Sequence, residues 1–246
     1  MPEHEIWLTR LFNDYLAGLG NWLLSLFRVR AENPARPWIN FITMEVLVAV
    51  IIVVLFAMVR PRLSMDRPGK AQHIFEVIYA FLRGEATENI GHEGPKFLPF
   101  LGTLFIFVLF CNLIGIIPGF ESPTMNPSVP AGCAVLVFVY YNFMGFKQQG
   151  ILGYLAHFAG PIWWLAILMI PIEIVSHLAR PLSLTIRLTV NMLAGEKVTM
   201  VFLGLTYLVA PAIFMGLHVF VSFLQAYVFA LLTMIYLSET VSHEQH

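Results

Sequence analysis

Charged residues are scarce in this sequence of 246 residues. Asp, Glu, Lys and Arg together make up 12%, whereas 58% of the residues are hydrophobic and the mean hydropathy is +0.76. Soluble domains carry about 25% charged and about 45–50% apolar residues, and a soluble globule of this size could not hide so much apolar surface from water. The scarcity of charge excludes an ordinary soluble enzyme or a disordered regulator and indicates an integral membrane protein.

Cysteine is nearly absent, and positive charge is not in excess. Cys111 and Cys133 lie in apolar runs without a CxxC or a Cys/His neighbour, so neither a disulfide scaffold nor a cysteine-based metal centre is expected. Lys and Arg number 14 against 15 Asp and Glu, a net charge of −1, and no nucleic-acid partner is expected. A P-loop is also missing, and we expect no bound cofactor and no nucleotide site.

Long apolar runs are what the chain has instead. The first is 41–59, and a loop at 60–70 with four basic residues follows it, which marks the cytoplasmic side of a membrane. The next segment, 70–91, carries an apolar stripe at helical spacing but is too polar to span. It is predicted to be an amphipathic helix on the cytoplasmic surface.

Two further runs, 97–118 and 131–146, are predicted to cross the membrane. The loop between them, 119–130, contains no Lys or Arg and is expected on the outside. Together with the basic loop after the first span, this pattern predicts an N-terminus outside and a C-terminus in the cytoplasm.

The stretch 163–205 contains no clear polar loop, although it is too long for a simple crossing. Forty-odd helical residues extend about 65 Å, whereas the hydrocarbon core of a bilayer is about 30 Å thick. The stretch is therefore either two crossings with a sharp break, at Pro171, Pro181 or Gly195, or one very oblique helix. A second long apolar stretch, 209–237, follows it.

Residues 1–40 differ from the rest of the chain because their apolar residues are interrupted by polar ones. Within them, 6–27 is predicted to be a short helix at the membrane surface. The sequence thus divides into an N-terminal interfacial segment of unassigned function, 1–40, and a membrane-embedded domain, 41–246.

Ionisable residues inside the long apolar stretches are the most informative feature. An arginine at the centre of a membrane helix costs about 2.5–3.5 kcal/mol even on insertion scales, and its guanidinium cannot lose a proton to avoid this cost. Arg187 lies in such a position. Glu173 and Arg180 precede it at seven-residue intervals on the same helical face, and Asn191 follows four residues later. Glu196 falls on the opposite face, nine residues after Arg187.

The last apolar stretch carries a second polar face, because His218 and Gln225 are seven residues apart. Glu173 is a candidate structural partner for Arg180. A fixed positive charge, a carboxylate and an imidazole buried in two long helices suit the movement of protons or other ions.

The run 180–196, RPLSLTIRLTVNMLAGE, resembles the signature of subunit a of F-type ATP synthases. That signature has an arginine, an asparagine four residues later and a small-Gly-Glu element, which here are Arg187, Asn191 and 194–196. The block 218–238, HVFVSFLQAYVFALLTMIYLS, resembles the last helix of the family, with His218 and Gln225 at matching places. A third element of the family resembles NLIGIIPG at 112–119.

The resemblance implies a non-catalytic stator subunit in the inner (plasma) membrane of a bacterium. Its partners would be a rotating c-ring of small subunits, each with one carboxylate, the peripheral-stalk b subunits and the rest of the ATP synthase complex. Two proton half-channels would reach the ring carboxylate from opposite sides, with Arg187 as the essential separator. The proton path would run along Asn191, Glu196, His218 and Gln225.

The family also implies a fold. This is an all-α integral membrane protein with five membrane-embedded helices and one amphipathic surface helix, the last two long helices forming a strongly tilted hairpin. A secondary transporter is the alternative, because it too buries charges at mid-membrane. Transporters usually show repeated halves and broken helices around a substrate site, and the sequence displays neither.

Overall fold

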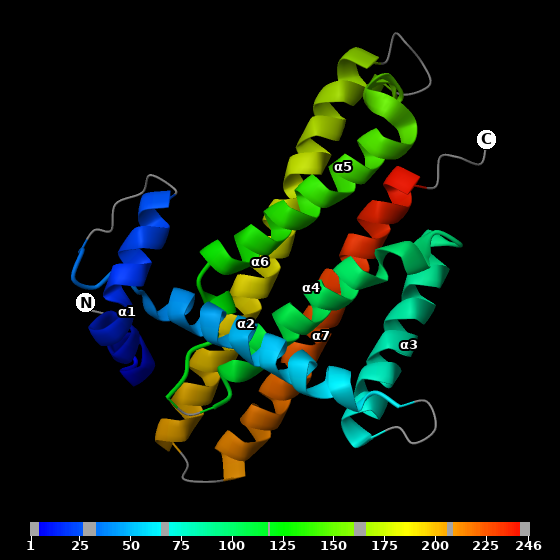
Figure 1. Ribbon diagram of the computed structural model, residues 1–246. Coiled ribbons are helices and arrows are strands. Elements are labelled where there is room, and N and C mark those ends of the chain that lie inside the picture. Colours follow the sequence, from blue (N-terminus) through cyan, green and yellow to red (C-terminus); the bar gives the residue numbers. More distant parts are fainter. Residues whose placement is uncertain are drawn as a thin grey trace.

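The computed structural model describes residues 5–26, 33–64, 69–117, 119–159, 166–205 and 209–241, and over these residues the protein is all-helical. Figure 1 shows the helices in chain order. The elements are α1 (Trp7–Leu26), α2 (Asn40–Val59), the 3-10 turn η1 (Arg60–Arg62), α3 (Lys70–Ile90), α4 (Gly94–Ile114), the 3-10 turn η2 (Pro123–Met125), α5 (Ser128–Ala159), α6 (Ala166–Leu205) and α7 (Val209–Val241). The predicted all-α fold is confirmed.

Five of these helices contain segments long and apolar enough to cross a membrane, as the sequence predicted. They are α2, α4, Ser128–Lys147 of α5, Ile167–Phe202 of α6 and Ala212–Thr240 of α7. The amphipathic α3 also forms where it was predicted. It buries Leu82, Ala86 and Ile90, which are four residues apart, and leaves most of its other faces exposed.

Helix α6 is a single continuous helix. It runs for 40 residues, about 60 Å, with Pro171 and Pro181 inside it, and it passes through Gly195 as well. The alternative of two crossings with a sharp break is therefore wrong. A proline removes one intrahelical hydrogen bond, and membrane helices tolerate this loss where neighbouring helices support them.

The long helices pack in pairs, with α5 beside α6 and α4 beside α7, while α6 and α7 form a hairpin (Figure 1). Their core contains fully buried side chains from four helices, among them Phe105, Tyr141, Leu188 and Met234. The contribution of α6 is narrow, because Leu184, Leu188 and Met192 form one buried stripe with four-residue spacing. Most of its remaining apolar residues point outward.

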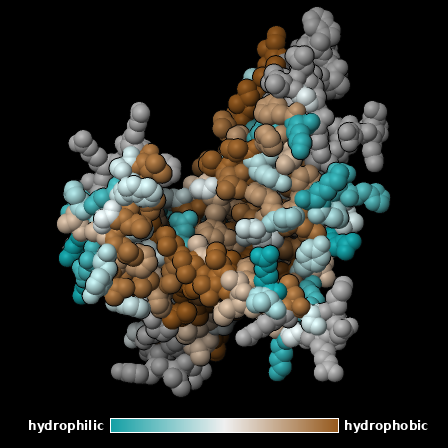
Figure 2. Space-filling view, in the orientation of Figure 1, coloured by the Kyte–Doolittle hydropathy of each residue, from teal (hydrophilic) through white to brown (hydrophobic). Residues whose placement is uncertain are grey.

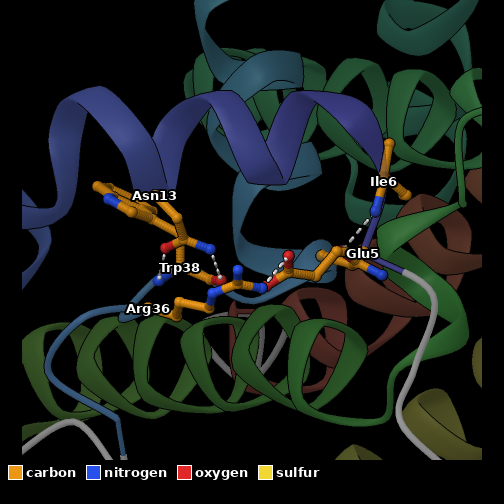
Figure 3. Close-up of polar contacts among 6 residues, drawn as sticks. Glu5, Ile6, Asn13, Arg36 and Trp38 are labelled. Atoms are coloured by element: carbon orange, nitrogen blue, oxygen red, sulfur yellow. Dashed lines mark hydrogen bonds and ion pairs between the residues drawn. The ribbon is translucent and has the colours of Figure 1, made fainter.

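The N-terminal helix lies at one flank of the molecule and is fixed to the segment that leads into α2 (Figure 3). The Asn13 amide accepts a hydrogen bond from the Trp38 N–H (2.9 Å) and donates one to the Trp38 carbonyl (3.1 Å). Arg36 forms an ion pair with Glu5 at 2.6 Å. Figure 2 shows hydrophilic side chains gathered at the flanks, over α1 and α3, and apolar ones over the central helices. Of the predicted N-terminal segment 1–40, residues 1–4 and 27–32 lie outside the described part.

Candidate functional site

Arg187 projects from the outward face of α6. It is exposed, and the neighbouring Ile186 and Val190 are each 53% exposed, so exposed apolar side chains flank the guanidinium. Among the described residues it has no ion-pair partner within 4 Å. The sequence predicted an arginine within an apolar membrane helix, and the family resemblance implied that it meets a ring carboxylate. In the isolated chain Arg187 is exposed beside the buried stripe of α6, and its charge acts on the Tyr236 hydroxyl of α7.

Glu196 and His218, unlike Arg187, point inward. Both lie where the C-terminal part of α6 crosses α7. His218 is 8% exposed and Glu196 is half-buried. Within the described residues, His218 Nε2 and Glu196 Oε2 are buried and have no hydrogen-bond partner. Gly195 lets α6 approach α7 here, because a Cβ at this position would lie 3.2 Å from His218 Nδ1. Two groups that can hold a proton therefore lie at the same helix crossing.

A cavity of about 380 Å³ lies between α6 and α7 at this crossing. Asn191, His218 and Gln225 line it, together with Gly195 and Thr199 and with apolar side chains of both helices. A buried water needs only about 10–15 Å³ of such volume and two to four polar partners, so the cavity has room for several water molecules. The structure thus brings three of the five predicted site residues to one cavity. Glu196 adjoins it through Gly195, while Arg187 does not line it.

A buried hydrogen-bond network closes the C-terminal end of α4 next to this cavity. The Thr124 hydroxyl donates to Asn112 Oδ1 at 2.7 Å, and Asn112 Nδ2 donates to the Ser222 carbonyl at 3.3 Å. The Ser122 hydroxyl donates to the Cys111 carbonyl at 2.8 Å. These bonds fix the η2 loop to α4 and α7, one helical turn beyond His218.

The same loop carries a carboxylate close to the site. Glu121 is exposed, and its charge acts on the carboxyl group of Glu196. The sequence predicted no role for Glu121, and Asn112 was recognisable only as part of a motif. The sequence did contain a signal for Asn112. It is a lone asparagine inside an apolar span, and a buried amide needs hydrogen-bond partners.

The N-terminal half of α6 carries a second polar cluster, in which all three side chains are linked. His177 is 8% exposed; its Nε2 lies 3.3 Å from Glu173 Oε1, and its Nδ1 lies 3.0 Å from the Tyr141 hydroxyl of α5. The expected pairing of Glu173 with Arg180 is therefore wrong. At i,i+4 spacing Glu173 faces His177, one helical turn away.

Arg180 pairs with a residue of α7. Its guanidinium lies 2.6 Å from Glu239 Oε2 and stacks over the Tyr236 ring at 5.0 Å from the ring centre. The ion pair and the ring contact join α6 to the end of α7. A planar guanidinium suits both contacts at once.

Comparisons with known proteins agree with this arrangement. The family model of the ATP synthase A chain matches residues 42–238. The chain is 65% identical over 234 residues to the ATP synthase subunit a of Solibacter usitatus (strain Ellin6076), covering 95% of this chain and 100% of that protein. It is 45% identical over 243 residues to the ATP synthase subunit a of Koribacter versatilis (strain Ellin345), covering 99% of both. The chain belongs to the ATP synthase A chain family.

Proposed function

We propose that this chain carries protons through two half-channels that meet at Arg187, and that it thereby couples proton flow to rotation of a c-ring. The family membership makes it a non-catalytic, multi-pass membrane subunit of a bacterial ATP synthase. The role of each residue is our proposal. No observation favours the alternative of a secondary transporter.

The outward position of Arg187 carries the proposal. A charge on an exposed face of a membrane helix is costly against lipid, so it calls for a partner of opposite charge. A ring whose subunits each present one carboxylate supplies that partner, and the length of α6 allows it to run along the ring. The peripheral-stalk b subunits and the remaining subunits would bind elsewhere on the chain.

The mechanism follows from the fixed charge. A ring carboxylate that faces lipid must be neutral, whereas close to Arg187 its anion is favoured. Two unit charges 4 Å apart gain about 4 kcal/mol at an effective dielectric constant of 20. Each carboxylate therefore releases its proton as it approaches Arg187 and is reprotonated from the other half-channel. The guanidinium also prevents protons from passing directly between the two half-channels.

The first half-channel in this proposal is the cavity between α6 and α7. Asn191, His218 and Gln225 line it, and Glu196 and His218 can each take up and release a proton. Their buried, unpartnered atoms support a water-filled path, because buried polar atoms without protein partners are normally satisfied by water.

The proposed topology puts this half-channel on the outside, with the N-terminus also outside and the C-terminus in the cytoplasm. Residues 1–40 would lie at the outer interface, where the exposed Trp7, Tyr15 and Trp22 of α1 suit the headgroup region.

Labelling of single cysteines from each side of the membrane tests this topology. Ser128→Cys, at an exposed position, should react from outside and His73→Cys from the cytoplasm. The reverse pattern would contradict the topology. Ser122 is a poorer probe because it is 3% exposed.

Arg187→Ala in the assembled complex tests the proposed function. We expect loss of both proton-driven ATP synthesis and ATP-driven pumping, with normal assembly because Arg187 packs into no core. Passive proton conductance of vesicles should rise, since nothing would bar the direct route. Arg187→Lys should also be badly impaired, because an ammonium is a compact charge that can lose its proton when desolvated. Normal pumping by assembled Arg187→Ala complexes would refute the proposal.

A further inference from the structure

A groove with a volume of about 700 Å³ lies between α2, α3 and α4, separate from the cavity beside His218. Helix α3 leads from the C-terminal end of α2 to the N-terminal end of α4, and α2 and α4 also contact each other (Figure 1). The lining is largely apolar and comes from all three helices, among them Ile52 and Phe56 of α2, Phe75 and Leu82 of α3, and Leu98 and Ile106 of α4. Such a surface favours hydrocarbon over water.

One end of the groove lies where the chain passes from α2 to α3. Phe56 and Phe75 line the groove there, and their ring centres are 5.0 Å apart. Beyond this ring pair, the Ser64 N–H donates a hydrogen bond to Gln72 Oε1, and Gln72 Nε2 donates one to the Ser64 carbonyl, both at 3.0 Å. The segment that follows α2 is therefore fixed to the first turns of α3 at this end.

Arg60 brings a positive charge to the same end. Ala49, Val53 and Phe56 of α2 line the groove, and Arg60 continues their spacing, one helical turn after Phe56. Its N–H bonds the Phe56 carbonyl, so the helical geometry extends to this residue. Arg60 is exposed, and among the described residues it has no ion-pair partner within 4 Å. A cation thus stands at the end of an apolar groove.

The surroundings of Arg60 are also basic. The segment 60–70 contains four basic residues and one acidic residue, Asp66, although the structure describes neither Asp66 nor Arg67. The first turn of α3 begins with the exposed Lys70 and contains no acidic residue. Glu76, in the next turn, accepts a hydrogen bond from Gln72 at 2.8 Å. Positive charge is therefore in excess at this end of the groove.

The lining favours an acyl chain over a helix of another subunit. Membrane helices pack closely through small residues spaced four apart, which let the backbones approach. The small lining residues here are Ala49 on α2 and the adjacent Gly102 and Thr103 on α4, so neither helix presents such a pair to the groove. A flexible chain can fill the space between bulky side chains, and basic pockets between membrane helices suit anionic headgroups.

We propose that the groove binds an anionic phospholipid, with an acyl chain between α2, α3 and α4 and the phosphate group at Arg60. The lipid fills the space between α2 and α3 and holds the surface helix against the bundle. In the proposed topology this site lies in the cytoplasmic leaflet, where juxtamembrane basic residues meet anionic lipid. The inference does not depend on the proton path.

The test uses the assembled complex in nanodiscs and two photoreactive lipids, phosphatidylglycerol and phosphatidylcholine, each with a diazirine in an acyl chain. Mass spectrometry of the peptides locates the labelled residues. Phosphatidylglycerol should label 49–56, 75–82 and 98–107 about fivefold more than phosphatidylcholine, the order of effect of one basic residue at an anionic surface. Arg60→Gln should reduce this labelling to the level of phosphatidylcholine.

Arg83→Gln is the matched control, because Arg83 is an exposed arginine of α3 outside the groove lining, and its replacement should leave the labelling unchanged. Gly102→Leu should reduce labelling by both lipids, since a side chain there extends into the groove toward Leu82, 4.0 Å from its Cβ. Should Gly102→Leu fail to assemble, Arg60→Gln decides.

Equal labelling of the groove by the two lipids would overturn the inference, because it would show unselective contact with the bilayer. A preference for phosphatidylglycerol that survives Arg60→Gln would overturn it as well. Labelling by both lipids elsewhere on the chain but not in the groove would show that another subunit fills the groove, and this result would also refute a lipid site.

Discussion

Toward its C-terminal end, α6 meets α7 around polar atoms that lack protein partners, whereas near its N-terminal end the polar side chains are bonded to one another. Glu196 Oε2, His218 Nε2 and the Ser222 hydroxyl are buried without a hydrogen bond among the described residues. At the other end, His177 has two partners and Arg180 is paired with Glu239. Leaving a buried polar group unsatisfied costs about 1–3 kcal/mol.

The two ends of α6 suit different tasks. The C-terminal end suits a water-filled proton path, and the N-terminal end holds neighbouring helices together. Three unpartnered groups beside a cavity of about 380 Å³ are understandable if water fills the cavity and completes their hydrogen bonds. The N-terminal end of α6 is joined to α5 and α7 by hydrogen-bonded and ion-paired side chains. Any proton that passes there must therefore be carried by those side chains. The predictions below alter one end of α6 and leave the other intact.

The largest effect is expected at the unpartnered end. Replacing Glu196 or His218 by Ala should slow ATP-driven pumping by about tenfold or more, because a positioned acid–base group commonly contributes at least that much. Exchanging the two residues should restore part of the rate, since each position would again hold a group that can carry a proton. Pumping by vesicles with assembled complexes is the measurement. An exchange as inactive as the double Ala variant would show that the two residues are not coupled.

A smaller effect is expected from narrowing the cavity without removing a titratable group. Gly195→Val should slow pumping a few-fold, because a Cβ there already lies 3.2 Å from His218 Nδ1 and a branched side chain must push the ring or the helix aside. Gly204→Val is the control, since nothing lies within 4 Å of a Cβ at that exposed position on the same helix. Equal rates for the two variants would contradict a narrow path at the crossing.

The membrane spans and the positions of the site residues along each helix could be predicted from the sequence, because both depend on local patterns. Apolar runs of about 20 residues define the crossings. Helical periodicity places Asn191 near Arg187 and Gln225 near His218. The contact of Glu173 with His177 also follows a local pattern, the i,i+4 spacing, whereas the seven-residue interval from Glu173 to Arg180 spans two turns and corresponds to no ion pair among the described residues.

The features that could not be predicted depend on contacts between residues that are distant in the sequence. Arg180 pairs with Glu239, 59 residues later, and helical spacing within one element carries no information on such a contact. The continuity of α6 could not be predicted either. Proline usually ends or kinks a helix of a soluble protein but is tolerated in packed membrane helices, and α6 contains Pro171 and Pro181. The exposure of Arg187 in the isolated chain did not follow from helical spacing, since one sequence cannot distinguish a buried face from a face that binds another chain.

The smallest effect on transport is expected from the η2 loop, whose polar side chains belong to the bonded cluster at the C-terminal end of α4. Thr124→Val removes the hydroxyl that donates to Asn112 Oδ1 at 2.7 Å and leaves a buried acceptor unsatisfied, with almost no change in side-chain volume. The loop should lose about 1–3 kcal/mol of local stability while pumping stays near normal, because the hydroxyl holds no proton in transit. Faster hydrogen–deuterium exchange of the 119–127 amides in the assembled complex is the measurement.

Thr103→Val provides the control for this loop, because Thr103 is exposed on α4 and its hydroxyl donates to the Pro99 carbonyl of its own helix at 2.7 Å. It should leave exchange in 119–127 unchanged. A loss of pumping in Thr124→Val as large as that in His218→Ala would instead place Thr124 and Asn112 on the proton path. The crossing of α6 and α7 would then have a bonded path beside it, and the contrast between the two ends of α6 would no longer hold. Unchanged exchange in Thr124→Val would show that the network does not hold the loop, and the fit of η2 against α4 at Gly115 would then account for its position.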